Sequence, residues 1–446
     1  MTKVNDALTV FEFGYLGVVD GALQSKRITH ISKAAFFYLK ALCLCEESES
    51  RFLTLKSIDN TEVLQVKNYA GVLFTPDGTQ IEVLPKIGRN LEGINGKEKS
   101  RKSLLNMLNT LGTFRHIQTF SANLTTSKMP LLEVFISQFL DAVNVLVKRR
   151  LKSDYVSCES NSHFLRGKLL VAQQLRYNAI NKHKFYVEHD EFLLDRPINR
   201  LIHKALGTVA TYTQSSKNQK LLKELLFVFA EIPISRNVKN DLSAVKFDKG
   251  MTYYKVPFDW AKLVLEGFSP LTMQGESYAL SLLFPLEAVF ESYVASVLSK
   301  TSIGGMNIEK QVNSQSLAVF NSRKFFRLKP DLIINCDSSR VVLDTKWKLI
   351  NSHKNNGTDK FGLSQSDLYQ MFAYGHKYLG GDGELFLIYP SHDDFMEPLE
   401  YCFEYSDSLR LWVVPFDVSV AVADDERLKL PVLSNFQVVP KQTLLS

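Results

Sequence analysis

The sequence predicts a multidomain α/β protein with a strand-rich N-terminal domain, a helical middle region and a C-terminal domain in which helices flank a mixed central sheet. A chain of 446 residues is too long for one simple hydrophobic core. Its hydrophobic pattern changes from short alternating runs to a helical period, and then to strands that alternate with helices. We therefore expect the domains to cover 1–98, 99–270 and 271–446.

The N-terminal segment is predicted to be mainly β-structure with one helix. Residues 63–88 alternate in short apolar and polar runs, as half-buried strands do. The sequence "TPDGT" at 75–79 has the Pro-Asp-Gly chemistry of a hairpin turn. The helix is expected near 32–44.

The middle region has a helical period. Residues 131–151 repeat Leu, Phe and Val at three- and four-residue spacing. A second helix is expected to begin with Asp195 as its N-cap and Pro197 in its first turn. Residues 266–277, "EGFSPLTMQGES", are the expected linker to the C-terminal domain.

Charge is distributed unevenly along the chain. Residues 1–270 contain 37 Lys and Arg against 26 Asp and Glu, whereas 271–446 contain 16 against 21. A basic front half suggests that the chain binds a polyanion or an acidic protein, although a solvated surface with a bias in sign gives the same counts.

Several classes of protein are not expected. The five cysteines lack zinc-site spacing, and the N-terminus does not resemble a signal peptide. No window approaches the roughly 18 to 20 apolar residues of a membrane span, so a reduced, cytoplasmic protein is expected. "GRNLEGIN" at 88–95 has the spacing of a phosphate loop, but Ile94 and Asn95 stand where Lys and Ser or Thr are required. We therefore expect this chain to bind no nucleotide itself.

Three charged residues are placed in unusually apolar surroundings within residues 328–350, "LKPDLIINCDSSRVVLDTKWKLI". Asp344 and Lys346 are two apart on an expected strand and so project to the same face. The polar stretch "NCDSSR" can turn the chain back, which would bring Asp331 near Asp344. Both strands are too apolar for an exposed ribbon and are expected to be buried on both faces.

Two neighbouring carboxylates repel each other unless a cation lies between them, and Mg²⁺ prefers oxygen ligands. A lysine beside them can orient or deprotonate a water that attacks phosphorus. This order of Asp, then Asp-x-Lys after a turn, is the pattern of the PD-(D/E)xK nucleases. The alternative is a solvated hairpin end with a surface ion pair worth about 0–1 kcal/mol.

Two helices are expected to complete the site. Upstream, Glu287 and Glu291 lie one turn apart at the edge of the apolar stripe of an amphipathic helix. Downstream, Gln370 and Tyr374 lie at i and i+4 on one helix face and form the Q-x-x-x-Y signature of one branch of these nucleases. A surface glutamate and a surface Gln–Tyr pair are the alternatives for each motif taken singly.

The chain resembles the McrC family, the cleavage subunits of modified-cytosine restriction systems. The stretches that carry this resemblance lie between Asn68 and Pro390 or just beyond, and they are "YAGVLFTPDGTQIEVLPKIG", "FLRGKL", "HDEFLLDRPINRLIHKAL", "FESYV", "LKPDLII", "VVLDTKW", "DLYQMFAYGHKY" and "LFLIYPSH". The second acid of the site is Asp rather than the commoner Glu, a shorter arm that requires closer approach of metal and strand.

The resemblance implies a Mg²⁺-dependent endonuclease that docks on a McrB-like AAA+ GTPase hexamer, with residues 1–98 in the docking region, and stimulates its GTP hydrolysis. After translocation it would cleave double-stranded DNA, which is expected to be modified. Asp331, Asp344 and Glu291 would bind the metal, and Lys346 would serve the attacking water. Gln370 and Tyr374 would support the site or contact backbone phosphate. Glu291 is preferred to Glu287 because it follows Phe290, as in the family's Phe-Glu pair.

Two other functions fit the same residues. One is a free-standing DNA repair nuclease of the Q-x-x-x-Y branch. The other is a non-catalytic adaptor of a ring NTPase, in which the nuclease fold is silent. Intact versions of all the site motifs argue against the adaptor. Co-purification of a hexameric GTPase with the chain would separate the leading hypothesis from both.

Overall fold

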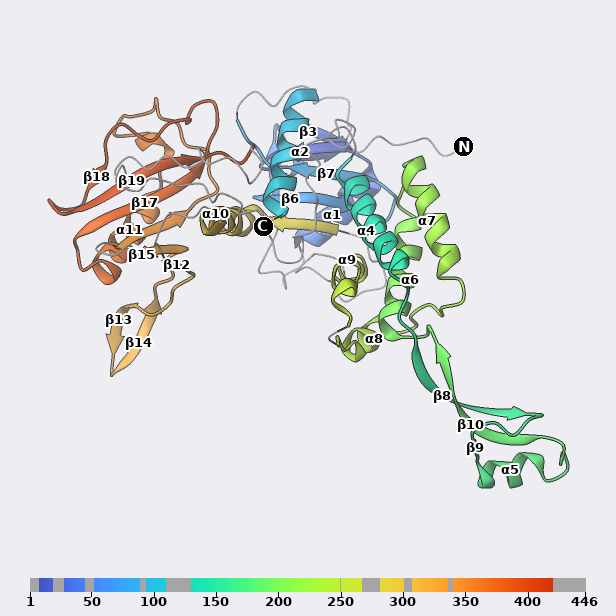
Figure 1. Ribbon diagram of the computed structural model, residues 1–446. Helices are drawn as coiled ribbons and strands as arrows, with labels where there is room; N and C mark the ends of the chain where they lie inside the picture. Colours follow the sequence, from blue (N-terminus) through green and yellow to red (C-terminus); the bar gives the residue numbers. More distant parts are fainter. Residues whose placement is uncertain are drawn as a thin grey trace, which may run out of the picture. The chain divides into compact units, whose positions relative to one another are not determined.

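The computed structural model describes residues 8–18, 28–44, 52–88, 94–109, 130–248, 250–266, 281–300, 307–335 and 340–419. The chain forms two compact units, and the first is built from both ends of the sequence. Unit 1 comprises Met1–Leu131 and Ser269–Ser446, and unit 2 comprises Leu132–Phe268. The predicted linker at 266–277 lies outside the described residues, apart from Glu266 at the end of a helix. Figure 1 labels many of the helices and strands of each unit.

Two four-stranded sheets and a helix form the N-terminal part of unit 1. The first sheet has the order β1-β7-β6-β11 and the second has the order β3-β2-β5-β4. Their strands are β1 (Leu8–Phe11), β2 (Tyr15–Val18), β3 (Ile28–Ile31), β4 (Leu53–Ile58), β5 (Thr61–Val66), β6 (Tyr69–Phe74), β7 (Gln80–Leu84) and β11 (Ser281–Pro285). The helix is α1 (Lys33–Leu44), where the sequence predicts it. Side chains from both sheets and from α1, such as Ile81, Leu64 and Leu39, share one buried core.

The hairpin turn predicted at 75–79 is confirmed. It joins the antiparallel strands β6 and β7, and the backbone N–H of Thr75 donates to the Thr79 carbonyl at 3.1 Å. Asp77 accepts hydrogen bonds from the hydroxyls of Thr75 and Thr79 at 2.5 and 3.0 Å. Side-chain oxygens of this kind stabilise a tight turn by satisfying groups that the backbone leaves open.

The strand β11 follows the expected linker in sequence but pairs with β6 in the N-terminal sheet. Gly71 of β6 has a φ of +143°, and a Cβ at this position would lie 1.8 Å from the Leu282 carbonyl oxygen. Only glycine permits two backbones to approach so closely. The N-terminal sheet therefore includes a strand from the predicted C-terminal domain, 271–446, a pairing that hydrophobic periodicity does not reveal.

A mixed six-stranded sheet forms the C-terminal part of unit 1. Its order is β12-β15-β16-β17-β19-β18, with β16, β17 and β19 parallel and the other pairings antiparallel. Its strands are β12 (Asn307–Lys310), β15 (Leu332–Asn335), β16 (Arg340–Thr345), β17 (Gly383–Pro390), β18 (Phe403–Glu404) and β19 (Leu409–Phe416). The apolar run "GELFLIYP" at 383–390 forms β17.

Helices pack against this sheet. α11 (Gln365–Tyr378) connects β16 to β17, and its Met371 and Tyr374 share a buried core with Val342 and Leu385 of those strands. α10 (Leu286–Lys300) packs with Phe290 and Tyr293 against Phe416. The predicted arrangement of a mixed sheet flanked by helices is therefore present. A separate hairpin, β13 (Ser316–Phe320) and β14 (Arg323–Arg327), leaves the sheet between β12 and β15.

Unit 2 contains most of the remaining helices. Apart from the helix within its small sheet, the described helices of unit 2 are α4 (Leu131–Lys148), α6 (Pro197–Ala210), α7 (Ser216–Val228), α8 (Val238–Ala244) and α9 (Lys255–Glu266). The helix α2 (Ile94–Leu108) lies in unit 1. The helix predicted at 131–151 is confirmed as α4. The helix predicted after Asp195 is confirmed as α6, but the N-cap is Arg196 and no side chain caps the helix. The Asp195 prediction is wrong because its carboxylate accepts a hydrogen bond from Arg200 Nη1 at 2.7 Å instead.

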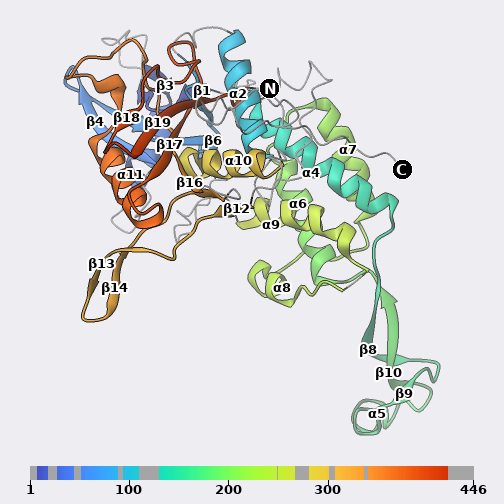
Figure 2. The ribbon, with the colours of Figure 1, turned by 60° about the vertical axis from the view of Figure 1, so that its left-hand side comes forward.

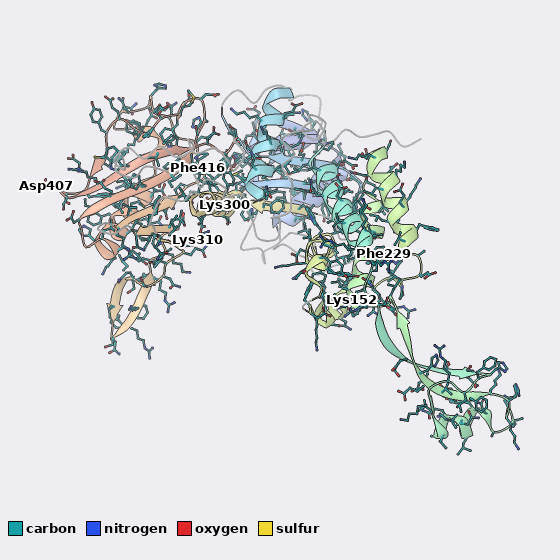
Figure 3. The ribbon with its side chains drawn as sticks, viewed as in Figure 1. Lys152, Phe229, Lys300, Lys310, Asp407 and Phe416 are labelled. Atoms are coloured by element: carbon teal, nitrogen blue, oxygen red, sulfur yellow. The ribbon has the colours of Figure 1, made fainter. Side chains whose placement is uncertain are left out.

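A three-stranded sheet interrupts the helical region of unit 2. It consists of β8 (Asp154–Ser162), β9 (Lys168–Leu169) and β10 (Phe185–Leu193), with α5 (Val171–Asn178) between the last two. We call residues 154–193 the β8–β10 extension; it begins just after Lys152, which Figure 3 labels. The sequence prediction of a mainly helical region omitted it. β8 and β10 pair in antiparallel register along nine residues each.

Within the ranges that the structure describes, no helix has both the length and the apolar character needed to cross a bilayer.

Candidate metal-dependent site

The β15–β16 hairpin brings the two predicted carboxylates together. Leu332 pairs with Leu343 in antiparallel register, so Asp331 and Asp344 occupy the next opposed positions. Val342 of β16 packs in the core beneath α11. Because alternate residues of a strand share a face, Asp344 lies on the side of the sheet that α11 covers. Residues 336–339 of the predicted turn lie outside the described residues.

Asp344 is a buried carboxylate whose charge is met by a neighbouring lysine. Its residue is only 1% exposed, and its Oδ2 atom forms an ion pair with Lys346. Burial raises the pKa of Asp344 above its ordinary value, and the nearby Asp331 carboxylate raises it further. A carboxylate in such surroundings is stabilised by positive charge.

Asp331 is held in a fixed orientation by the strand opposite. Its Oδ2 accepts hydrogen bonds from both the backbone N–H and the hydroxyl of Thr345, each at 2.7 Å. Burial raises the pKa of Asp331, against the opposing effect of these hydrogen bonds. The two contacts fix one oxygen of the carboxylate.

Lys346 supplies a positive charge at the site. Its Nζ lies 2.6 Å from Asp344 Oδ2, and its backbone N–H donates to the Ile388 carbonyl of β17 at 2.9 Å. Burial alone would lower the pKa of Lys346, but the carboxylates of Asp344 and Asp331 outweigh it and the net shift is upward. The side chain is therefore an ammonium group at neutral pH.

The two candidate glutamates of α10 have different neighbours. Glu291 Oε1 accepts a hydrogen bond from Gln311 Nε2 at 2.9 Å, and the backbone N–H of Gln311 donates to the Asp331 carbonyl at 2.9 Å. Burial and then the Asp331 carboxylate raise the pKa of Glu291. Glu287 is exposed, and its Oε1 accepts from Asn68 Nδ2 at 2.8 Å in the N-terminal sheet region. The structure therefore places Glu291, and not Glu287, beside Asp331.

Gln370 and Tyr374 connect α11 to the segment that carries Asp331. Gln370 Nε2 donates to Tyr374 Oη at 2.6 Å, and Tyr374 Oη donates to the Lys329 carbonyl at 2.9 Å. One turn later, Tyr378 Oη donates to the Leu328 carbonyl at 2.9 Å. These hydroxyls hold the backbone immediately before Asp331, which is a structural role for the pair.

Sequence reasoning missed three residues near these groups. Asp367, in the first turn of α11, is close enough to Asp344 to contribute to its raised pKa. Tyr389 of β17 is fully buried, and burial together with Asp367 and Asp344 raises its pKa above the ordinary range. Gln311 links Glu291 to Asp331 as described above. A single Asp, Tyr or Gln without a motif gives no signal in sequence.

The arrangement suits a cation that needs few protein ligands. Among the residues that the structure describes, no three His, Cys, Asp and Glu side chains lie close enough to form a metal-binding cluster. Mg²⁺ commonly binds through one or two carboxylates and keeps several waters. The pair Asp331 and Asp344, two carboxylates at opposed positions of the β15–β16 hairpin, fits that mode of binding.

A buried glutamate connects the N-terminal sheet to the residue after Lys346. Glu12, in the turn after β1, accepts hydrogen bonds from Trp347 Nε1 at 2.9 and 3.0 Å and from the Lys86 backbone N–H at 2.7 Å. The Trp347 ring also packs edge-to-face on Phe290 of α10, with 5.3 Å between ring centroids. Burial raises the pKa of Glu12 to about 7, although the hydrogen bonds from Lys86 and Trp347 oppose it.

We expect Glu12 to make the folded chain less stable as the pH rises from about 4.5 to about 7, because across that range the folded state keeps a proton that the unfolded state has released. A pKa raised from 4.5 to about 7 corresponds to about 3 kcal/mol in the free energy of unfolding. Glu12→Gln keeps the shape but cannot titrate, so its thermal midpoint should change less than that of the wild type between about pH 5 and about pH 8. Glu62→Gln, whose side chain is 54% exposed, is the matched control. Equal pH dependence in the wild type and Glu12→Gln would contradict this expectation.

Comparison with known proteins agrees with this architecture. The model of the family described as "McrBC 5-methylcytosine restriction system component" matches residues 64–390. No individually curated protein matches the chain. A chain from the tetradecameric assembly of Thermococcus gammatolerans McrB AAA+ hexamers with bound McrC is 20% identical, with a TM-score of 0.66 over 93% of this chain and 96% of that one.

A second solved structure, the Thermococcus gammatolerans McrBC complex, contains a chain that is 21% identical, with a TM-score of 0.46 over 66% of this chain and 88% of that one. The first structural match shows a shared fold, and the family match extends over most of the sequence. The predicted resemblance is confirmed: the chain belongs to the family of McrBC 5-methylcytosine restriction system components.

Proposed function

We propose that this chain is a Mg²⁺-dependent DNA endonuclease of the PD-(D/E)xK type that works with a ring-shaped AAA+ GTPase. The observation that carries the proposal is the position of Asp331, Asp344 and Lys346 at the end of one buried hairpin. Family membership supports a role in DNA restriction. The McrB hexamers in the structurally similar assembly support a ring partner.

Electrostatics support a divalent cation at this site. The Asp331 carboxylate raises the pKa values of both Asp344 and Glu291, and the Lys346 ammonium lowers them. Three carboxylates and one ammonium leave a net negative charge in a largely buried setting, which is costly without a further positive charge. Asp331 and Asp344 would hold Mg²⁺. The predicted third ligand, Glu291, would have to move closer to both, because no three such side chains cluster among the described residues.

In the proposed reaction, water attacks a phosphodiester phosphorus and the P–O bond to one sugar oxygen breaks. When bound, Mg²⁺ supplies Lewis-acid stabilisation of the charge that develops on the phosphoryl oxygens. The Thr345 hydrogen bonds keep Asp331 in one orientation, so the site needs little reorganisation. Lys346, as an ammonium group, donates hydrogen bonds that position the water and the phosphate beside Asp344.

Replacing Glu291 with Gln is expected to lower plasmid cleavage by at least about tenfold, whereas Glu287→Gln should change it by less than about twofold. Only Glu291 is placed to influence Asp331, while the carboxylate of Glu287 bonds Asn68. The two variants are matched because they make the same change one turn apart on α10. Cleavage rates in Mg²⁺ with the partner ring present provide the measurement, and the opposite ranking would exclude the assignment of Glu291.

The β8–β10 extension is our candidate for contact with the ring, in addition to the docking region predicted at 1–98. Six large apolar side chains on it are exposed: Phe164, Leu165, Val171, Leu175, Tyr177 and Ile180. The "FLRGKL" stretch turns through Gly167, whose φ is +76° and where a Cβ would lie 2.3 Å from the Glu188 carbonyl oxygen. Exposed apolar patches of this kind are typical of protein–protein contact sites.

Truncating the chain is a poor way to separate contact with the ring from the candidate cleavage site. A fragment that ends near residue 271 would lack β11, which completes the sheet edge beside β6. Exposed strand edges of that kind promote aggregation. Substitutions in the full chain avoid the difficulty.

A further inference from the structure

The hairpin β13–β14 is an exposed ribbon that carries apolar and basic side chains together. Figures 1 and 2 both show it extending away from the six-stranded sheet, between β12 and β15. Figure 3 labels Lys310 at the end of β12, where the chain turns toward the hairpin. All five residues of β14 and four of the five residues of β13 are exposed.

Aromatic side chains dominate the hairpin surface. Phe320 is 74% exposed and Phe326 is 72% exposed, although phenylalanine is usually buried. Phe325 contacts both rings edge-on or tilted, with centroid distances of 6.1 Å to Phe320 and 6.5 Å to Phe326. The hairpin thus presents a small aromatic cluster to solvent.

The charge on this segment has one sign. Residues 311–330 contain four basic residues and no Asp or Glu, and the four are Arg323, Lys324, Arg327 and Lys329. In the described part of the chain, no carboxylate forms an ion pair with the three that lie on β14, and the Lys324 ammonium bonds the Ser314 carbonyl at 3.1 Å. Net acidic sequence surrounds this basic segment, since 271–446 as a whole has more Asp and Glu than Lys and Arg. A polyanion is therefore the occupant that the charges favour.

The backbone holds the hairpin in a defined shape. Phe320 pairs with Arg323 across the two-residue turn Asn321-Ser322, whose φ angles are +46° and +60°. Positive φ at both central residues is the mark of a type I′ turn, which matches the twist of a hairpin. Strands of five residues at about 3.3 Å each place the turn about 16 Å from the base, enough to reach across a groove of duplex DNA.

The base of the hairpin is fastened directly to the candidate site. Tyr378 Oη donates to the carbonyls of Val312 and Leu328, which flank the hairpin, at 3.2 and 2.9 Å. Tyr374 holds the Lys329 carbonyl, two residues before Asp331. The same helix face therefore positions both the carboxylate and the ribbon, so a duplex that touches the hairpin passes close to Asp331.

We propose that the β13–β14 hairpin binds the DNA duplex beside the bond to be cut, with Arg323, Lys324 and Arg327 on backbone phosphates and the exposed phenylalanines against sugars and base edges. This inference deepens the proposed nuclease function and rests on it, because only a nuclease would cut a bond at this place. Phosphate contacts give affinity without sequence specificity. Such a contact suits a chain that cuts DNA selected elsewhere in a complex.

The test measures binding of the full chain to a short fluorescent duplex, without divalent cation so that no cleavage occurs, over a series of salt concentrations. The triple variant Arg323→Ala, Lys324→Ala, Arg327→Ala should weaken binding at least about tenfold and lower the slope of log K against log salt by about 2 to 3. The double variant Phe320→Ser, Phe326→Ser should weaken binding but leave that slope unchanged, because it removes no charge.

The matched control removes the same charge from unit 2, with Lys220→Ala, Lys223→Ala and Lys239→Ala, three exposed lysines. It should bind DNA almost as the wild type does. The proposal would be overturned if the hairpin variants bound DNA with wild-type affinity, or if the control lost as much affinity as they do. It would also be overturned if the hairpin variants lost binding to the ring but still bound DNA. Plasmid cleavage by the wild type tests the nuclease assignment separately. If the wild type cleaves and the hairpin variants bind DNA normally, only the hairpin contact is refuted. If the wild type does not cleave, only the nuclease assignment is refuted.

Discussion

Asp344→Asn is expected to reduce DNA cleavage by at least about 1,000-fold, which corresponds to about 4 kcal/mol of transition-state stabilisation. The substitution keeps the shape of the side chain and removes a carboxylate that would hold the metal. Asp344 is buried with a raised pKa, so replacing it with a neutral group should not lower the thermal midpoint. Lys346→Ala should give the same loss of activity because the ammonium beside Asp344 disappears.

The measurement is conversion of supercoiled plasmid in Mg²⁺ with the partner ring, together with GTP turnover by that ring. GTP turnover should be unaffected by Asp344→Asn, and the exposed Asp359→Asn is the matched control for both assays. Cleavage by Asp344→Asn at the wild-type rate would show that the nuclease assignment is wrong. A wild-type chain that stimulates the ring but cuts no DNA would support the adaptor, and cleavage that needs no ring would support the free-standing nuclease.

The double substitution Phe164→Ser and Ile180→Ser is expected to abolish stimulation of the ring's GTP hydrolysis at moderate protein concentrations. Burial of each large apolar side chain at an interface contributes about 1.5–3 kcal/mol. Losing two of them should therefore weaken binding by at least about 100-fold, at about 1.4 kcal/mol per tenfold. Their exposures of 78% and 92% mean that neither supports the fold of the chain itself.

Phe227→Ser is the matched control, because Phe227 is 83% exposed on α7 and outside the extension. It should leave stimulation near the wild-type level. The dependence of GTP turnover on the concentration of this chain separates weaker binding from a lower maximum. Normal stimulation by the double variant would remove the extension from the partner contact and leave residues 1–98 as the predicted docking region.

Much of the fold and of the candidate site was available from local sequence. Continuous apolar runs identified β15 and β16, and a helical period identified α4, α6, α10 and α11, because these patterns report how an element is buried. The site motifs were readable because Asp344 and Lys346 share a strand face, and Gln370 and Tyr374 share a helix face. In each case the residues that act together are separated by one step of a regular element.

The tertiary structure decided the features that depend on distant pairing. The antiparallel register sets Asp331 opposite Asp344, and Gln311 selects Glu291 over Glu287 through a contact twenty residues away. Similarly, β11 joins the N-terminal sheet because Gly71 admits its backbone, and Glu12 bonds a tryptophan 335 residues later. Local sequence determined which elements form, since their periods reflect burial. Which elements meet depends on shape and hydrogen bonding between segments far apart in the chain, and no local pattern of residues encodes that.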